Sequence, residues 1–207
     1  MIRCFLAIEL PDDLRSGLAQ VQEELKRSRA DVRWVAPGNI HLTLKFFGNV
    51  PDDEIETLAQ AAREAAAETA PLQLKATGVG AFPSPTAPRV VWLGLGGDMV
   101  PLTQIFYRLE KAFAALGYPP EGRAFNPHLT LGRVKSPANR DKLARLLAKL
   151  PPVDWPPFAV GELILFQSVL SPKGSTYTPL RVIPLGSVSG RTHVSAPTGA
   201  NAGDPFK

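Results

Sequence analysis

Apolar and polar residues along this chain follow two patterns, one typical of short strands and one typical of amphipathic helices. Several longer segments begin with proline and acidic residues, such as PDD after the first apolar run and PDDE near residue 51, as is common in the first turn of a helix. Gly48 marks the expected end of one strand and Gly117 the expected end of one helix. The pattern predicts strands at 2–10, 40–47, 72–81, 89–95, 127–134, 157–169 and 176–185, a short extended segment at 31–35, and helices at 11–29, 52–69, 99–116 and 138–149.

One hexapeptide frame, Asn-x-His-Leu-Thr-Leu, occurs twice, as NIHLTL and as NPHLTL, and it holds two of the three histidines in the chain. Because side chains alternate across a strand, His41 and Thr43 point to one face while the leucines beside them point to the other. His128 and Thr130 are related in the same way. Each copy therefore predicts an imidazole and a hydroxyl on the open face of a packed strand.

The repeated frame also predicts a fold of two similar halves. A β–α unit lies near each copy, and the chain has no glycine-rich nucleotide-binding fingerprint. We expect an α+β protein in which residues 1–185 form a single bilobal domain. Residues 186–207 are small and polar, so we predict a disordered tail there, and we interpret His193 within it as nonfunctional.

Charge and cysteine content indicate which partners and which cell compartment to expect. The net charge is +4, and the excess of basic residues is concentrated in 121–150. This region indicates either a phosphate-bearing partner or a solvated helix face. The single cysteine, Cys4, forms no intramolecular disulfide, which favours the cytoplasm. The apolar run at the N-terminus is too short to span a membrane. We expect no membrane association, and a monomer.

Two imidazoles and two hydroxyls that face one cleft suit in-line displacement at phosphorus without a metal. A protonated histidine can give a proton to a leaving oxygen while a neutral one accepts a proton from the nucleophile, and each transfer contributes about 10² to 10⁴ in rate. A threonine hydroxyl can donate a hydrogen bond to a phosphoryl oxygen. We expect neither a metal ion nor a cofactor.

Three other interpretations compete with this one. The histidines could be ordinary strand residues, although repetition of the whole frame argues against that. A zinc site usually needs three protein ligands, and the repeat strands supply no carboxylate. A nucleophilic serine or cysteine is disfavoured, because Cys4 lies in a strand expected to be buried and no Gly-x-Ser-x-Gly sequence occurs.

The sequence resembles the two-histidine (2H) phosphoesterases, and within them the RNA 2′,3′-cyclic phosphodiesterase (2′-5′ RNA ligase) family. The resemblance covers about residues 1–185 and rests on the paired His-x-Thr motifs together with RCFLAIEL, VRWVAPGNIHLTLKFFGNV, FNPHLTLGRV and QSVLSPKGSTYTPL. It implies two pseudo-symmetric lobes, whose antiparallel sheets form a central cleft with helices outside. It also implies hydrolysis of a ribose 2′,3′-cyclic phosphate to a 2′-phosphomonoester, with 2′-5′ RNA ligation as a secondary, reverse activity.

The resemblance also assigns roles to single residues. His41 would be the general acid that protonates the departing 3′ oxygen, and His128 would be the general base that activates water. Thr43 and Thr130 would hold the phosphoryl oxygens. Arg133 matches an arginine that often follows the second motif, where its charge could neutralise the phosphate.

Strict alternation raises a difficulty for Arg133, because it places the side chain on the leucine face of its strand. The same rule places Lys45 on the His41 face, as a second candidate for the phosphate. Phe47, Trp92 and Tyr177 are candidates for stacking on a base, although a place in the core is the more common role for each of them.

We therefore expect RNA ends or nucleotides bearing a 2′,3′-cyclic phosphate as substrates. Two other functions stay open. The first is another 2H phosphodiesterase, acting on 2′-5′ oligoadenylate or on a different cyclic nucleotide. The second is a non-catalytic module that binds phosphate ends, although the intact histidine pair argues against simple binding, for which arginine or lysine would be sufficient.

Overall fold

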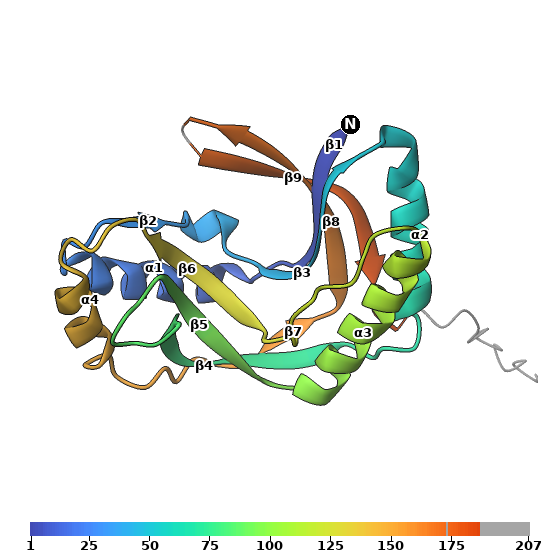
Figure 1. The fold of residues 1–207 in the computed structure, drawn as a ribbon. Helices are drawn as coiled ribbons and strands as arrows, with labels where there is room; N and C mark the ends of the chain where they lie inside the picture. The colour runs from blue at the N-terminus through green and yellow to red at the C-terminus, as the bar shows by residue number, and fades with distance from the viewer. Residues whose placement is uncertain (173, 187–207) are drawn as a thin grey trace, which may run out of the picture.

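The computed structural model describes residues 1–172 and 174–186 and has an α+β architecture built on two antiparallel sheets (Figure 1). Its elements are β1 (Ile2–Ile8), α1 (Asp12–Lys26), β2 (Val32–Trp34), the 3-10 helix η1 (Pro37–Asn39), β3 (Leu42–Val50), the 3-10 helix η2 (Asp52–Glu54), α2 (Ile55–Ala66), β4 (Leu72–Phe82), β5 (Val90–Gly97), α3 (Met99–Ala115), β6 (His128–Val134), α4 (Arg140–Leu147), β7 (Phe158–Val160), β8 (Glu162–Ser171) and β9 (Gly174–Pro184).

The two sheets divide the motif strands between them. The first sheet, called sheet A here, has the order β3-β1-β8-β9, and the second, sheet B, has the order β2-β6-β5-β4-β7. The first His-x-Thr motif therefore belongs to sheet A and the second to sheet B. The expectation of an α+β fold with antiparallel sheets is confirmed.

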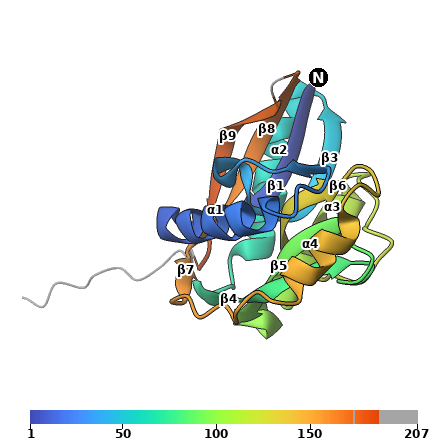
Figure 2. The same ribbon diagram turned by 90° about the vertical axis from the view of Figure 1, so that its left-hand side faces the viewer.

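Helices cover the outer faces of the sheets. In Figure 1, α2 and α3 pack together beside sheet A, and in Figure 2, α1 and α4 lie in front of sheet B. Helix α1 begins with Asp12 and Asp13, whose charges favour a helix N-terminus, and it buries Leu14, Leu18 and Leu25 at helical spacing. One continuous cluster of buried apolar side chains includes residues from both sheets, so the cleft between them has firmly packed walls.

Three expectations about element boundaries need correction or lie outside the described residues. Gly48 does not end its strand. It adopts φ +75° beside a register shift, which glycine tolerates, and β3 continues to Val50. The apolar run 157–169 is two strands rather than one, because the chain leaves sheet B after β7 and enters sheet A with β8. Most of the tail expected at 186–207 falls in 187–207, outside the described residues.

Candidate active site

The backbone holds both motif histidines in the same way. The Nδ1 of His41 lies 2.8 Å from the carbonyl oxygen of Asn39, and the Nδ1 of His128 lies 2.7 Å from the carbonyl oxygen of Asn126. A carbonyl can only accept, so Nδ1 carries the proton in both rings. Each neutral histidine therefore keeps Nε2 as a lone-pair acceptor, and each protonated one keeps it as a donor. The asparagine at the first position of the repeated frame thus orients the histidine through its backbone carbonyl.

The two rings differ in their surroundings. His41 stacks on Phe5 with ring centroids 4.6 Å apart, and the edge of Tyr177 meets it at 5.3 Å. Burial lowers the pKa of His41, and the hydrogen bond to the Asn39 carbonyl opposes this effect. His128 meets the edge of Phe82 at 5.2 Å. These aromatic contacts restrict the positions of both imidazoles.

One cleft of about 890 Å³ lies between the sheets, and both motifs line it. His41 and Thr43 contribute from sheet A, and His128 and Thr130 from sheet B, so the structure brings all four predicted side chains together. The loop that precedes β6 closes one side, with Arg123 among the lining residues. A cavity of this size has room for a nucleotide.

A β-bulge in β3 changes which side chains reach the cleft after the first motif. In the pairing with β1, Thr43 lies opposite Ala7 and Lys45 lies opposite Leu6, so Leu44 is an extra residue. Alternation reverses after the bulge. Lys45 turns inward and is 3% exposed, whereas Phe46 is 43% exposed and lines the cleft. Lys45 still borders the cleft, as expected, but its side chain is buried and paired, so Phe46 is the exposed side chain that follows Thr43 there.

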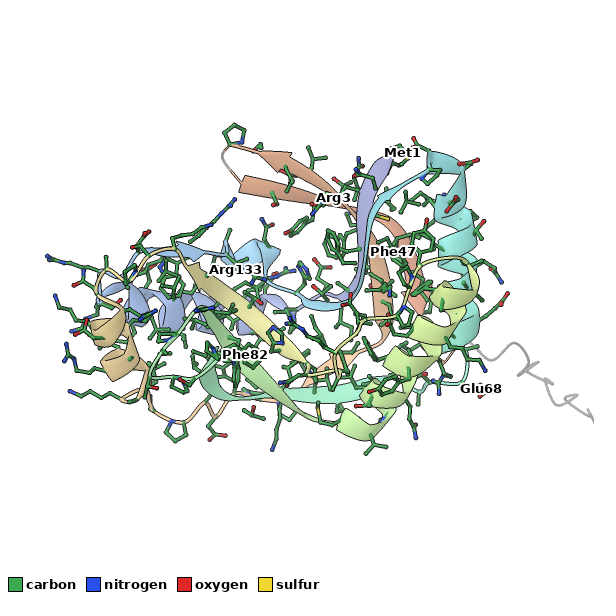
Figure 3. The ribbon with its side chains drawn as sticks, in the orientation of Figure 1. Met1, Arg3, Phe47, Glu68, Phe82 and Arg133 are labelled. Atoms are coloured by element: carbon green, nitrogen blue, oxygen red, sulfur yellow. The ribbon has the colours of Figure 1, made fainter. Side chains whose placement is uncertain are left out.

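A matching bulge in β6 removes the objection to Arg133. In the pairing with β5, Thr130 lies opposite Trp92 and Gly132 lies opposite Val91, so one residue between them is extra. Gly132 then faces the core, where a Cβ would lie 2.8 Å from Trp34 Cε3. Arg133 turns to the cleft face and is exposed there; it is labelled in Figure 3. The predicted phosphate-binding arginine is thus at the cleft.

Lys45, which was expected as a second phosphate-binding candidate, is bound by groups of the protein itself. Its Nζ lies 2.8 Å from Glu110 Oε1 and donates a hydrogen bond of 2.6 Å to the carbonyl of Pro119. The other oxygen of Glu110 accepts a hydrogen bond from the backbone N–H of Glu121. This buried ion pair joins the strand of the first motif to the loop that leads to His128.

Of the three aromatic candidates for stacking, the structure brings one to the cleft. Tyr177 lines it, whereas Phe47 packs in the core against Phe113 with centroids 4.8 Å apart. Trp92 packs on Phe82 at 5.1 Å and is not among the cleft-lining residues. Phe46 was missed because alternation alone cannot locate a bulge.

Arg3 was also missed. It lines the cleft from β1, as Figure 3 indicates, with its Cζ 4.6 Å from the centroid of the Phe46 ring. This cation–π contact adds a third arginine to Arg123 and Arg133 at the cleft, and this one lies on the wall that carries His41. No sequence motif marks it.

Residues 1–172 and 174–186 show neither a cluster of metal ligands nor a helix that could span a membrane. No group of three or more histidine, cysteine or carboxylate side chains is placed to share a metal ion there. Within the same residues, every helix is too short or too polar to cross a membrane.

A model of the LigT-like phosphoesterase family matches residues 8–92 and 99–177, which include both His-x-Thr motifs. The chain belongs to the LigT-like phosphoesterase family. Among curated relatives, the RNA 2′,3′-cyclic phosphodiesterase of Methanothermobacter thermautotrophicus is 39% identical over 184 residues, which is 89% of this chain and 99% of the relative. That of Methanocaldococcus jannaschii is 31% identical over 180 residues, or 87% and 99%.

Solved LigT-like structures have the same fold. The Escherichia coli LigT complex with 3′-AMP is 28% identical with a TM-score of 0.73, over 89% of this chain and 98% of that one. A Thermus thermophilus protein has 29% identity and the same TM-score, over 89% and 98%. The resemblance seen in the sequence is therefore confirmed. The chemical roles of the individual residues of this LigT-like phosphoesterase stay predictions.

Proposed function

We propose that this protein hydrolyses 2′,3′-cyclic phosphates at RNA ends or on nucleotides to 2′-phosphomonoesters. The observation that carries the proposal is the pair of histidines that line one cleft, each with Nδ1 held by a backbone carbonyl, which leaves Nε2 as the atom for proton transfer. Curated relatives named RNA 2′,3′-cyclic phosphodiesterase support the choice of substrate.

The proposed reaction is an in-line displacement. Nε2 of His128 takes a proton from water as its oxygen bonds to phosphorus, and the bond from phosphorus to the 3′ oxygen breaks. Nε2 of His41 gives its proton to that oxygen, so a free 3′-hydroxyl and a 2′-phosphate result. The two rings finish with their protonation states exchanged and return to the starting state by proton exchange with solvent. No charge has to build up on the leaving oxygen.

The remaining cleft residues act on charge and position. Thr43 and Thr130 donate hydrogen bonds to nonbridging oxygens, and Arg133 neutralises the phosphate and its developing charge. Phe46 offers an exposed ring on which the base stacks. The positions that follow the two bulges therefore have different roles: Phe46 on sheet A stacks on the base, and Arg133 on sheet B binds the phosphate.

The experiment that tests the proposal is product analysis in EDTA. The protein is incubated with adenosine 2′,3′-cyclic phosphate, and the products are separated by chromatography against 2′-AMP and 3′-AMP standards. We expect 2′-AMP. Formation of 3′-AMP would contradict the assignment of the leaving oxygen, and saturable binding without turnover would indicate a binding module.

The same assay separates the other catalytic candidates. An enzyme for 2′-5′ oligoadenylate would cleave the 2′-5′ dinucleotide faster than the 2′,3′-cyclic phosphate. Ligation would appear as a 2′-5′ linkage when a 5′-hydroxyl oligonucleotide is added in excess, because that hydroxyl replaces water as nucleophile. We propose hydrolysis as the main activity because water is always in excess.

We propose a cytoplasmic monomer in which residues 1–185 act as one bilobal unit. The single cysteine, Cys4, is buried and free, and burial raises its pKa to about 11, which suits an unreactive thiol in a reducing compartment. Sedimentation at several concentrations tests the oligomeric state, and fractionation of the source cells tests the location.

A further inference from the structure

Two arginines lie directly opposite each other on neighbouring strands of sheet B. Arg33 of β2 is the register partner of Arg133 of β6, and both are exposed. Directly opposed residues point to the same face with their Cβ atoms about 5 Å apart, and like charges placed this way destabilise the strand pair. The face is fixed, because Val32 and Trp34 on either side of Arg33 pack on the core.

No carboxylate offsets this repulsion in the described part of the chain. None of the ion pairs found between residues of 1–172 and 174–186 includes Arg33 or Arg133. Asp31, the acidic residue nearest to Arg33 in sequence, pairs with neither. Two unpaired guanidinium groups side by side are a natural site for an anion, whose binding would remove the repulsion.

The two arginines differ in their relation to the cleft. Arg133 lines it, whereas Arg33 is one strand further out, on the edge strand of sheet B, and is not among the lining residues. Neighbouring strands are about 4.8 Å apart. A phosphate in the cleft can contact Arg133, and a second phosphate of the same ligand, just outside the cleft, can contact Arg33. A mononucleotide has no second phosphate to place there.

We propose that Arg33 binds the phosphodiester that joins the terminal nucleotide to its 5′ neighbour, while Arg133 contacts the terminal phosphate in the cleft. This inference rests on the proposed function, and it makes a chain of two or more nucleotides the better substrate. The edge strand lets the rest of the RNA continue into solvent. Specificity for RNA ends over free nucleotides then comes from one side chain outside the catalytic cleft.

Equilibrium binding tests the site without requiring turnover. Calorimetry compares 2′-AMP with the dinucleotide ApA that carries a terminal 2′-phosphate, for the wild type and for Arg33→Ala. We expect the wild type to prefer the dinucleotide by about five- to twentyfold at low salt, and the variant to bring this ratio close to one. For the dinucleotide, the slope of log Kd against log salt should fall by about 0.7 in the variant, as for one lost phosphate contact.

Arg63→Ala on α2 is the matched control, because it removes the same charge from the other lobe and should keep the wild-type ratio. Arg33→Lys should restore part of the preference, since it keeps the charge without the planar fork. The inference is overturned if the wild type binds both ligands equally, or if Arg33→Ala weakens both by the same factor. If the ratio depends on Arg33 but adenosine 2′,3′-cyclic phosphate is not hydrolysed, the proposed function fails while the phosphate site stands.

Discussion

The buried pair of Lys45 and Glu110 allows one prediction to be worked out from its contacts. The two side chains are 3% and 7% exposed, and Lys45 Nζ has two partners, the carboxylate at 2.8 Å and the Pro119 carbonyl at 2.6 Å. Lys45→Met fills similar space but leaves the Glu110 carboxylate buried opposite a thioether. Removing one member of a buried ion pair destabilises a protein by about 3–5 kcal/mol, a large part of the roughly 5–15 kcal/mol that holds a typical domain together.

A double variant separates the pair from the loss of packing. Lys45→Met combined with Glu110→Gln removes both charges, and the amide oxygen can still accept the backbone N–H of Glu121. We expect it to recover most of the lost stability, because replacing a buried pair is often nearly neutral. Urea unfolding followed by circular dichroism measures each free energy of unfolding.

An exposed ion pair serves as the control for this series. Arg145 and Asp141 on α4 are 66% and 69% exposed, so Arg145→Ala should cost less than about 1 kcal/mol. The reasoning is refuted if Lys45→Met costs no more than that control, or if the double variant is less stable than the single one. Turnover should fall together with stability in Lys45→Met, since the pair anchors the loop that precedes His128.

Three further predictions concern the cleft. Phe46→Ala should weaken binding of 2′-AMP by about 5- to 100-fold in calorimetry, because stacking on one base contributes about 1–3 kcal/mol. Binding of a base-free ribose 2′-phosphate should change little, and an equal loss for both ligands would contradict a stacking role. Arg133→Ala should raise the KM for the cyclic phosphate about tenfold or more, with a melting temperature at or above that of the wild type because the repulsion from Arg33 is removed. Arg133→Lys should recover part of the lost affinity, and wild-type kinetics in Arg133→Ala would remove this residue from the site. The kcat/KM should follow a bell-shaped pH curve, because the doubly protonated histidine pair has no base and the doubly deprotonated pair has no acid. The acid limb of this curve should lie below the ordinary histidine pKa, since burial lowers the pKa of His41. A monotonic curve between about pH 5 and 9 would exclude an acid–base pair.

The sequence alone was enough to predict the two motifs and the class of fold. Repetition of the frame located His41 and His128, and alternation gave the correct face for Thr43 and Thr130 because each lies before the bulge in its strand. Helix positions followed from apolar spacing and from acidic N-termini such as that of α1. These features depend on neighbours within a few residues.

Features that depend on strand pairing could not be predicted in this way. A bulge is an extra residue relative to a partner strand, and the partner is distant in sequence. Alternation therefore placed Arg133 on the wrong face and did not show that Phe46, rather than Lys45, is the exposed side chain after Thr43. The cross-strand neighbour Arg33 became visible only with the register of β2 and β6. The break between β7 and β8 has a local signal in the sequence, because Gly161 lies between the two strands.

Comparison of the two halves shows how a repeated frame becomes an asymmetric site. Both copies keep the same histidine–carbonyl contact and the same bulge, yet the next cleft-facing position holds Phe46 in one and Arg133 in the other. A nucleotide is itself asymmetric, with a flat base at one end and a charged phosphate at the other. The exposed ring of Phe46 on one wall and the guanidinium of Arg133 on the other match that asymmetry.

The most direct test of the central claim is turnover of adenosine 2′,3′-cyclic phosphate in EDTA by His41→Ala and His128→Ala, measured beside their melting temperatures. The account predicts that each variant loses about 10² to 10⁴ in kcat while it melts close to the wild-type temperature. Turnover near the wild-type level in either variant, or a loss of activity that only follows a loss of the fold, would contradict it.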